Sequence, residues 1–123
     1  MNRKELFKSL NILCCEMQES YNINNGGCCF VAAVIAEQLE IYNIPFYVAV
    51  TYSPTHYAIK VKDRYINRDD YKFDLNDLRE WDSQELYDTY YDGDWNDWYN
   101  RRWNLIVRTR IRSIFRKYEN SRT

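Results

Sequence analysis

The sequence of 123 residues contains no long apolar run, only three glycines and two prolines, and one histidine. No window approaches the roughly 18 apolar residues that a membrane-spanning helix needs, and the polar residues 1–5 are unlike the start of a signal peptide. The scarcity of glycine and proline excludes collagen-like and low-complexity disordered chains. We therefore expect one globular domain over residues 1–123, located in the cytoplasm.

Net charge is also nearly absent, at a formal value of −1, which argues against a nucleic-acid partner and a membrane surface. The charges are unevenly distributed along the chain. The charged positions of residues 74–97 are almost all acidic, and those of residues 98–123 are almost all basic. We interpret the basic segment as one long amphipathic helix whose charge is balanced by the acidic segment. The alternative is a helix that binds phosphate backbones or an acidic partner.

Cysteine occurs only as two adjacent pairs, Cys14 with Cys15 and Cys28 with Cys29. Because we expect no secretion signal, thiols are favoured over disulfides. Neighbouring cysteines on a helix point in different directions, and one histidine is too few for the common zinc sites, so we expect no metal and no cofactor. Cys14 and Cys15 fall in a predicted helix over residues 3–20, where we interpret them as packing residues.

Residues 24–40 are the most informative stretch. Two asparagines and two glycines lead into an alanine-rich apolar run, which predicts a buried helix. Cys28 and Cys29 lie in its first turn, where unpaired N–H groups and the helix dipole favour a nucleophilic thiolate. These N–H groups, with Asn24 or Asn25, are candidates for an oxyanion hole. The alternative is that both cysteines only fill apolar space.

Three strands are predicted downstream of this helix. They cover residues 46–52, 56–61 and 64–68. A two-residue turn at positions 62–63 would place His56, Asn67 and Asp69 on one face of the sheet, with Asp69 opposite His56. An imidazole beside a thiolate stabilises it and later protonates a leaving group, while a third polar side chain orients the ring.

The spacing of these residues resembles the transglutaminase-like branch of the papain-like cysteine peptidases. The resemblance covers residues 24–70 and rests on Gly26-x-Cys28, Ala32, Leu39, Ile44 with Pro45, and the segment that begins at His56. The chain departs from the family pattern at Asn43, where glycine is usual. The resemblance implies an α+β fold in which a central helix, with cysteine at its N-terminus, packs on a small antiparallel sheet. Residues 1–20 and 74–123 would form covering helices.

The same resemblance implies a cysteine-dependent hydrolase or acyltransferase that acts on a peptide or isopeptide bond. Its triad would be Cys28, His56 and Asn67, with Cys29 and Asp69 as alternatives for the first and third members. The helical stripe from Cys28 carries apolar residues, whereas that from Cys29 ends on a glutamate, which favours Cys28. We expect a protein or peptide substrate. The competing hypothesis is a catalytically inactive interaction module with the same fold.

Overall fold

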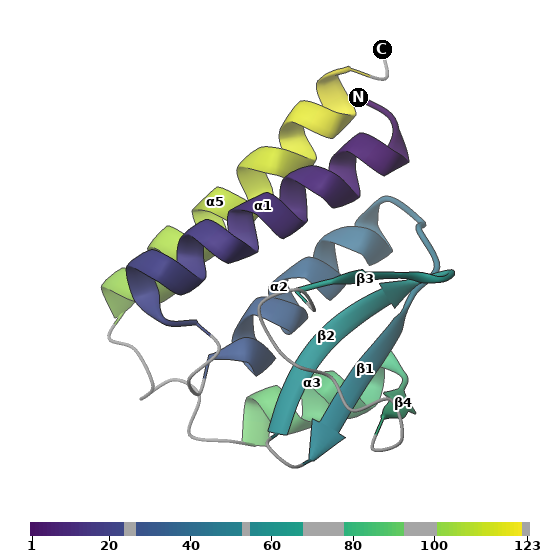
Figure 1. Cartoon of the computed structure of the whole chain (residues 1–123), viewed down its shortest axis with the longest axis vertical. Helices are drawn as coiled ribbons and strands as arrows, with labels where there is room; N and C mark the ends of the chain where they lie inside the picture. The colour runs from purple at the N-terminus through teal and green to yellow at the C-terminus, as the bar shows by residue number, and fades with distance from the viewer. Residues whose placement is uncertain (24–26, 53–54, 68–77, 93–100, 122–123) are drawn as a thin grey trace.

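The computed structural model describes residues 1–23, 27–52, 55–67, 78–92 and 101–121. Within these ranges the protein has a mixed α+β fold of four helices and one four-stranded antiparallel sheet (Figure 1). The helices are α1 (Arg3–Tyr21), α2 (Cys28–Ile41), α3 (Ser83–Asp92) and α5 (Arg101–Asn120). The strands are β1 (Tyr47–Tyr52), β2 (Thr55–Val61), β3 (Arg64–Ile66) and β4 (Arg79–Trp81), in the spatial order β3-β2-β1-β4. The predicted α+β class is therefore confirmed.

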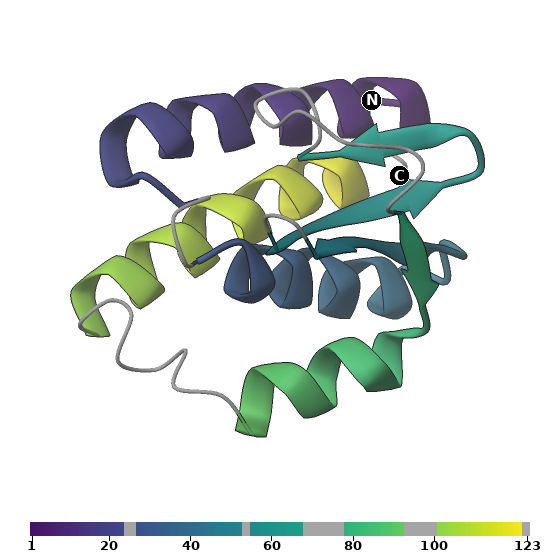
Figure 2. The same ribbon diagram turned by 60° about the horizontal axis from the view of Figure 1, so that its bottom comes forward.

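Helix α2 is the central element of the fold. Of its 14 residues, 11 are buried, as expected for a helix that is apolar on all sides. It packs against β2 on one side and against α3 and α5 on the others, and Figure 2 shows it enclosed between the sheet and these two helices. The buried residues form one core cluster to which every described helix contributes.

Helix α2 ends in a Schellman motif, which positions the chain for β1. The main-chain N–H of Asn43 bonds to the carbonyl of Glu40 at 3.1 Å, and that of Ile44 bonds to the carbonyl of Leu39 at 2.9 Å. Asn43 has a φ of 57°, a left-handed conformation that asparagine tolerates well. The C-cap is Tyr42, so Asn43 is the first residue beyond the helix.

The hairpin of β2 and β3 has the register that the two-residue turn predicts, with Val61 opposite Arg64. The prediction was wrong about the end of the third strand. The ladder stops at Ile66, whereas the sequence predicted a strand to residue 68. Asn67 has a φ of 68°, which is outside the extended region and ends the strand. The predicted pairing of Asn67 with β2 is therefore not part of the ladder.

The two faces of the sheet differ in chemistry. One face is apolar and belongs to the core cluster; it carries Val48, Val50, Tyr57, Ile59, Val61 and Ile66. The register of β1 and β2 places Thr51, His56, Ala49 and Ala58 on the other face, where all four are also buried. His56, the second residue of β2, is thus a buried polar residue within the sheet.

Strand β4 was not predicted. It pairs antiparallel with β1, with Trp81 opposite Val48. Three residues are too few to show a strand period, and the surrounding acidic sequence favoured a helical interpretation. The strand forms because the edge of β1 offers unpaired main-chain groups.

Helix α3 begins with a capping box. The side chain of Asp82 accepts a hydrogen bond from the N–H of Glu85 at 2.9 Å, and the side chain of Glu85 accepts one from the N–H of Asp82 at 3.4 Å. The cap therefore lies one residue before Ser83, the first residue of the helix.

The long terminal helices α1 and α5 lie side by side and run in opposite directions, so that the first and last described residues are close together (Figure 1). Arg110 of α5 forms an ion pair with Glu16 of α1 at 2.8 Å. The predicted apolar stripe of α5 is confirmed at Val107, Ile111, Phe115 and Tyr118, all buried. Among the described residues, α5 pairs with glutamates of α1 and α2, and not with the acidic segment that the sequence analysis expected to balance it.

Candidate functional site

Cys28 is the first residue of α2, and its side chain is 3% exposed. Gly27 precedes it as the N-cap and provides no side-chain hydrogen bond to the helix. The main-chain N–H groups of Tyr57 and Cys29 lie close enough to the Cys28 sulfur to hydrogen-bond to it. The Tyr57 contact joins the start of α2 to the start of β2.

Burial raises the pKa of the Cys28 thiol above its ordinary value, and the nearby main-chain N–H groups lower it by less. The sequence analysis expected the helix N-terminus to favour the thiolate. That expectation is wrong for this structure, because loss of hydration outweighs the N–H groups. Cys28 is therefore a neutral thiol at physiological pH.

Cys29 is less suited to be the nucleophile. It is fully buried, and burial, followed by the charge of neighbouring Cys28, raises its pKa to about 12. Its side chain belongs to the apolar core cluster. The higher pKa and complete burial of Cys29 make Cys28 the better candidate, and the choice between them stays a prediction.

His56 is fully buried, and its Nε2 atom lies 2.8 Å from the main-chain carbonyl oxygen of Asn67. A carbonyl oxygen only accepts hydrogen bonds, so Nε2 must carry the proton. In the neutral ring the other nitrogen, Nδ1, then has a lone pair and is the basic atom. Burial lowers the pKa of His56, and the bond to the carbonyl raises it by less. The ring is therefore a neutral base at pH 7.

Asn67 meets His56 through its main chain, whereas the sequence predicted contact through its side chain. The left-handed conformation of Asn67 ends β3 at the point where its carbonyl faces the ring. Asparagine is among the few residues that adopt this conformation readily. The alternative third member, Asp69, lies outside the described residues, as do Asn24 and Asn25.

Asn11 of α1 is a residue that the sequence analysis missed. Its Oδ1 accepts the N–H of Asn67 at 2.8 Å, and its Nδ2 donates to the carbonyl of Tyr65 at 3.0 Å. One amide thus holds the main chain on both sides of Ile66. The signal in the sequence was a polar residue within the buried stripe of α1, between Phe7 and Cys14, both of which are buried.

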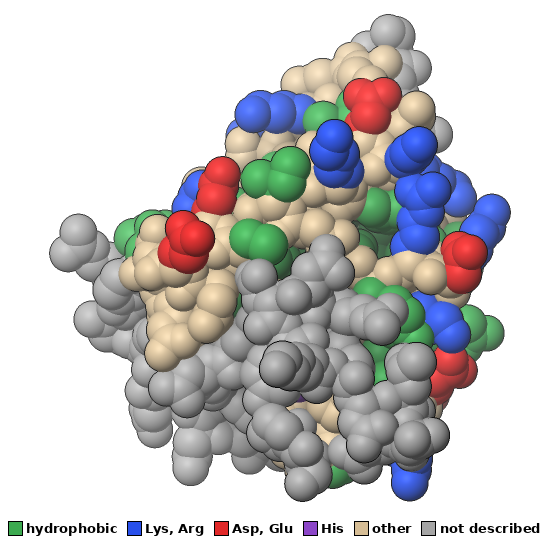
Figure 3. Space-filling model, viewed as in Figure 1, with side chains coloured by type: hydrophobic (Ala, Val, Ile, Leu, Met, Phe, Trp, Pro, Cys, Tyr) green, Lys and Arg blue, Asp and Glu red, His purple; other side chains and the backbone are tan. Residues whose placement is uncertain are grey.

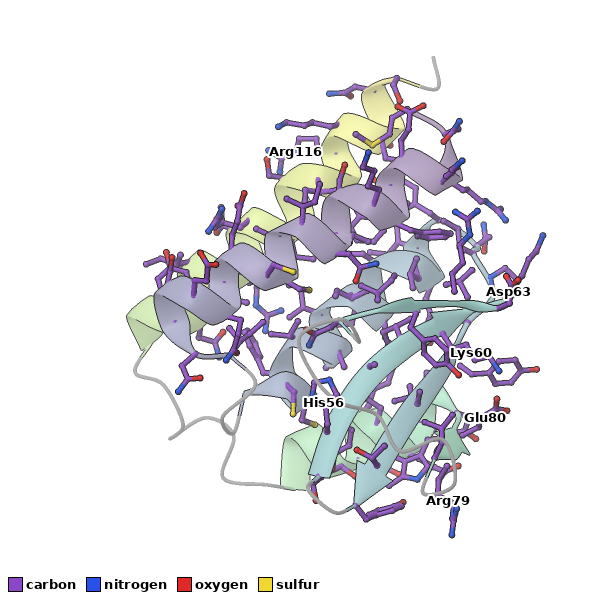
Figure 4. The ribbon with its side chains drawn as sticks, in the orientation of Figure 1. His56, Lys60, Asp63, Arg79, Glu80 and Arg116 are labelled. Atoms are coloured by element: carbon purple, nitrogen blue, oxygen red, sulfur yellow. The ribbon has the colours of Figure 1, made fainter. Side chains whose placement is uncertain are left out.

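The Tyr57 contact brings the start of α2 to the start of β2. Tyr57, whose N–H holds the Cys28 sulfur, directly follows His56 in the chain. Figure 4 shows His56 projecting from the start of β2 beside the N-terminal end of α2. The candidate nucleophile and the single histidine therefore lie at one junction of helix and strand.

The ring of Tyr57 is buried on the apolar face of the sheet. Burial, and then the charges of Cys29 and Cys28, raise its pKa to about 12, so it stays protonated. Its ring packs edge-on against that of Trp81, with the ring centroids 5.7 Å apart. The hydroxyl of Tyr57 thus lies near both thiols without supplying a charge.

The four cysteines form no disulfide. In the described ranges no three histidine, cysteine, aspartate or glutamate side chains are grouped as a metal site requires. None of the described helices has both the length and the apolar character to cross a bilayer.

A scan of protein-family models finds no match to this chain, and comparisons with curated proteins and with solved structures find none either. The resemblance to the transglutaminase-like branch therefore rests on the short motifs of residues 24–70 alone.

Proposed function

We propose that this protein is a cysteine-dependent hydrolase of amide bonds, in peptides or isopeptides, built on a transglutaminase-like core. Cys28 is the nucleophile and His56 is the general base and acid. The observation that carries the proposal is the hydrogen bond from the N–H of Tyr57 to the Cys28 sulfur, because it brings the thiol to the residue that follows His56.

The chemistry follows from the protonation states. As Sγ of Cys28 bonds to the substrate carbonyl carbon, its proton moves to Nδ1 of His56. The imidazolium then protonates the amide nitrogen, and the C–N bond breaks to release the amine and leave a thioester. Water attacks the thioester while Nδ1 takes its proton, and cleavage of the S–C bond returns the proton to the sulfur. Attack by an amine in place of water gives acyl transfer.

Both Cys28 and His56 are neutral before the reaction, and this determines the role of His56. A raised thiol pKa and a lowered imidazole pKa both oppose a resting thiolate–imidazolium pair. His56 therefore acts as a base in the step of attack, and Asn67 keeps the ring in the tautomer that makes this possible. The carbonyl of Asn67 also stabilises the charged ring that forms.

The same pKa directions favour one competing function. A buried neutral thiol and a buried neutral imidazole are also what an inactive interaction module would keep as core residues. The two functions differ in whether the Cys28 thiol reacts faster than an equally buried thiol that lacks a base.

The chain contains matched controls for this test. Cys14 is 1% exposed and Cys29 is 0% exposed, so that both are at least as buried as Cys28. The experiment is alkylation with iodoacetamide at pH 7.5, with the rate at each cysteine measured by mass spectrometry. We expect Cys28 to react faster than Cys14 and Cys29 by on the order of tenfold or more, because in the proposed mechanism His56 acts as the base for Cys28.

The variant His56→Gln should remove this advantage and leave the rates at Cys14 unchanged. Cys28 reacting no faster than Cys14 in the wild-type protein would contradict the proposed chemistry and favour the inactive module. Unfolding would raise the rates of all the cysteines together, so a selective effect at Cys28 separates loss of the base from loss of the fold.

A further inference from the structure

We infer that a basic hollow at the opposite end of β2 binds a small ligand that carries several phosphate groups. Two adjoining hollows, of about 420 and 280 Å³, lie between α1 and the turn that joins β2 to β3, and both are lined by Lys4 and Arg64. We call these two hollows together the basic hollow. Binding there requires no chemistry at Cys28.

The charge of this hollow is strongly one-sided. Its lining contains five cationic side chains, Arg3, Lys4, Lys8, Lys62 and Arg64, and one carboxylate, Asp63. All five cations are exposed, and none takes part in the ion pairs found among the described residues. The whole chain has a net charge of −1, so the positive potential is local to this end of the molecule.

The cations come from two walls that face each other across the hollow. Lys4 and Lys8 are one helical turn apart and so share a face of α1. Lys62 and Arg64 flank the tip of the hairpin opposite, where Asp63 is labelled in Figure 4. Figure 3 shows lysine and arginine side chains gathered over this end of the molecule. Converging cations favour a compact anion with several charges over a single carboxylate.

The conformation of Lys62 adds a second observation. Its φ of 56° is left-handed, in a turn where asparagine or glycine is strongly preferred. A lysine in this conformation costs roughly 1–2 kcal/mol relative to a residue that adopts it freely. A cation is thus present at a backbone position that disfavours it, and such local exceptions are expected at functional sites.

The size of the hollow favours a small ligand. Volumes of a few hundred Å³ are typical of small-molecule sites. A nucleic acid would extend beyond the hollow and also contact the exposed cations of α5, such as Arg112 and Arg116. These two arginines are one helical turn apart, as Lys4 and Lys8 are, and provide a matched control.

The test is a titration of the full chain with inorganic tripolyphosphate in low salt, followed by amide NMR shifts. We expect saturable shifts around Lys8 and at residues 62–65. The double variant Lys8→Glu with Arg64→Glu should weaken binding by about tenfold, equivalent to about 1.4 kcal/mol. The control, Arg112→Glu with Arg116→Glu, should change it by less than about twofold, because these side chains lie outside the hollow.

Two results would overturn the inference. One is the absence of saturable shifts at the hollow with millimolar tripolyphosphate, and the other is equal weakening by both double variants. A parallel titration with single-stranded oligothymidylate distinguishes the ligand class: tighter binding of this oligomer, weakened equally by both variants, would replace the small-ligand site with a nucleic-acid surface. If the Glu variant does not fold, Lys8→Gln with Arg64→Gln makes the same comparison.

Discussion

The polar residues at the two ends of β2 differ in burial. At the first end, His56 and Tyr57 are 0% and 5% exposed, and burial determines their pKa directions. At the other end, Lys62 and Arg64 are exposed to solvent. The comparison shows that one short strand carries a neutral, desolvated site at one end and exposed cations at the other.

The largest difference between the two ends is expected in stability. Tyr57→Ala removes a buried ring that packs on Trp81, and we expect it to lower the free energy of unfolding by about 3–5 kcal/mol. Lys62→Gly at the other end relieves a left-handed lysine and should be neutral or stabilising by up to about 1 kcal/mol. Urea denaturation of both variants measures the difference in the free energy of unfolding. Equal losses of stability in the two variants would contradict it.

Asn11 connects the two ends, since it lines the basic hollow and also holds Asn67. Asn11→Ala leaves two partly buried main-chain groups without this amide, and we expect a loss of about 1–3 kcal/mol. It should also lower the pKa of His56 further, because the Asn67 carbonyl that raises this pKa is no longer held in place.

The matched control is Asn2→Ala in the same helix. Asn2 caps α1 by accepting the N–H of Glu5 at 2.8 Å, and its loss should cost about 1 kcal/mol. The NMR titration of His56 should be unchanged in this variant. A His56 pKa that responds alike to both substitutions would show that Asn11 acts only through general stability.

A smaller effect is expected in the pH dependence of stability. The folded pKa of His56 lies below its unfolded value of about 6.5, so the unfolded chain binds the proton more readily. Stability from this group is complete above pH 6.5 and is lost as the pH falls through the folded pKa, by up to about 1.4 kcal/mol per pH unit. Urea denaturation between pH 7 and 5 measures it. His56→Gln should flatten the curve, and a wild-type stability that rises toward pH 5 would contradict the burial of a neutral ring.

Much of the fold could be predicted from local pattern. The apolar spacing of Leu6, Leu10 and Met17 predicted α1, and these residues are buried. The cysteine helix and the hairpin register were predicted for the same reason, because periodicity and short turns are local properties. Strand β4 depends instead on the open edge of β1, which no local pattern reveals.

The candidate site was less predictable than the fold. The positions of Cys28 and His56 followed from motif spacing, but the support of the ring did not, because it uses a main-chain carbonyl that is independent of side-chain identity. Asn11 lies 56 residues before Asn67 in the sequence. It could be recognised only as a polar residue in an apolar stripe. The direction of the thiol pKa depends on burial, which a helix N-terminus does not reveal.

The most direct test of the account is the state of the His56 ring, which is the only imidazole in the chain. Nitrogen NMR across pH, in the wild-type protein and in Cys28→Ala, reports its tautomer, its pKa and its contact with the thiol. We predict a ring protonated at Nε2 at pH 7, a pKa below 6.5, and a change at Nδ1 when the Cys28 sulfur is removed. A ring protonated at Nδ1, a pKa above 6.5, or indifference to Cys28→Ala would contradict the pairing of this thiol with this imidazole.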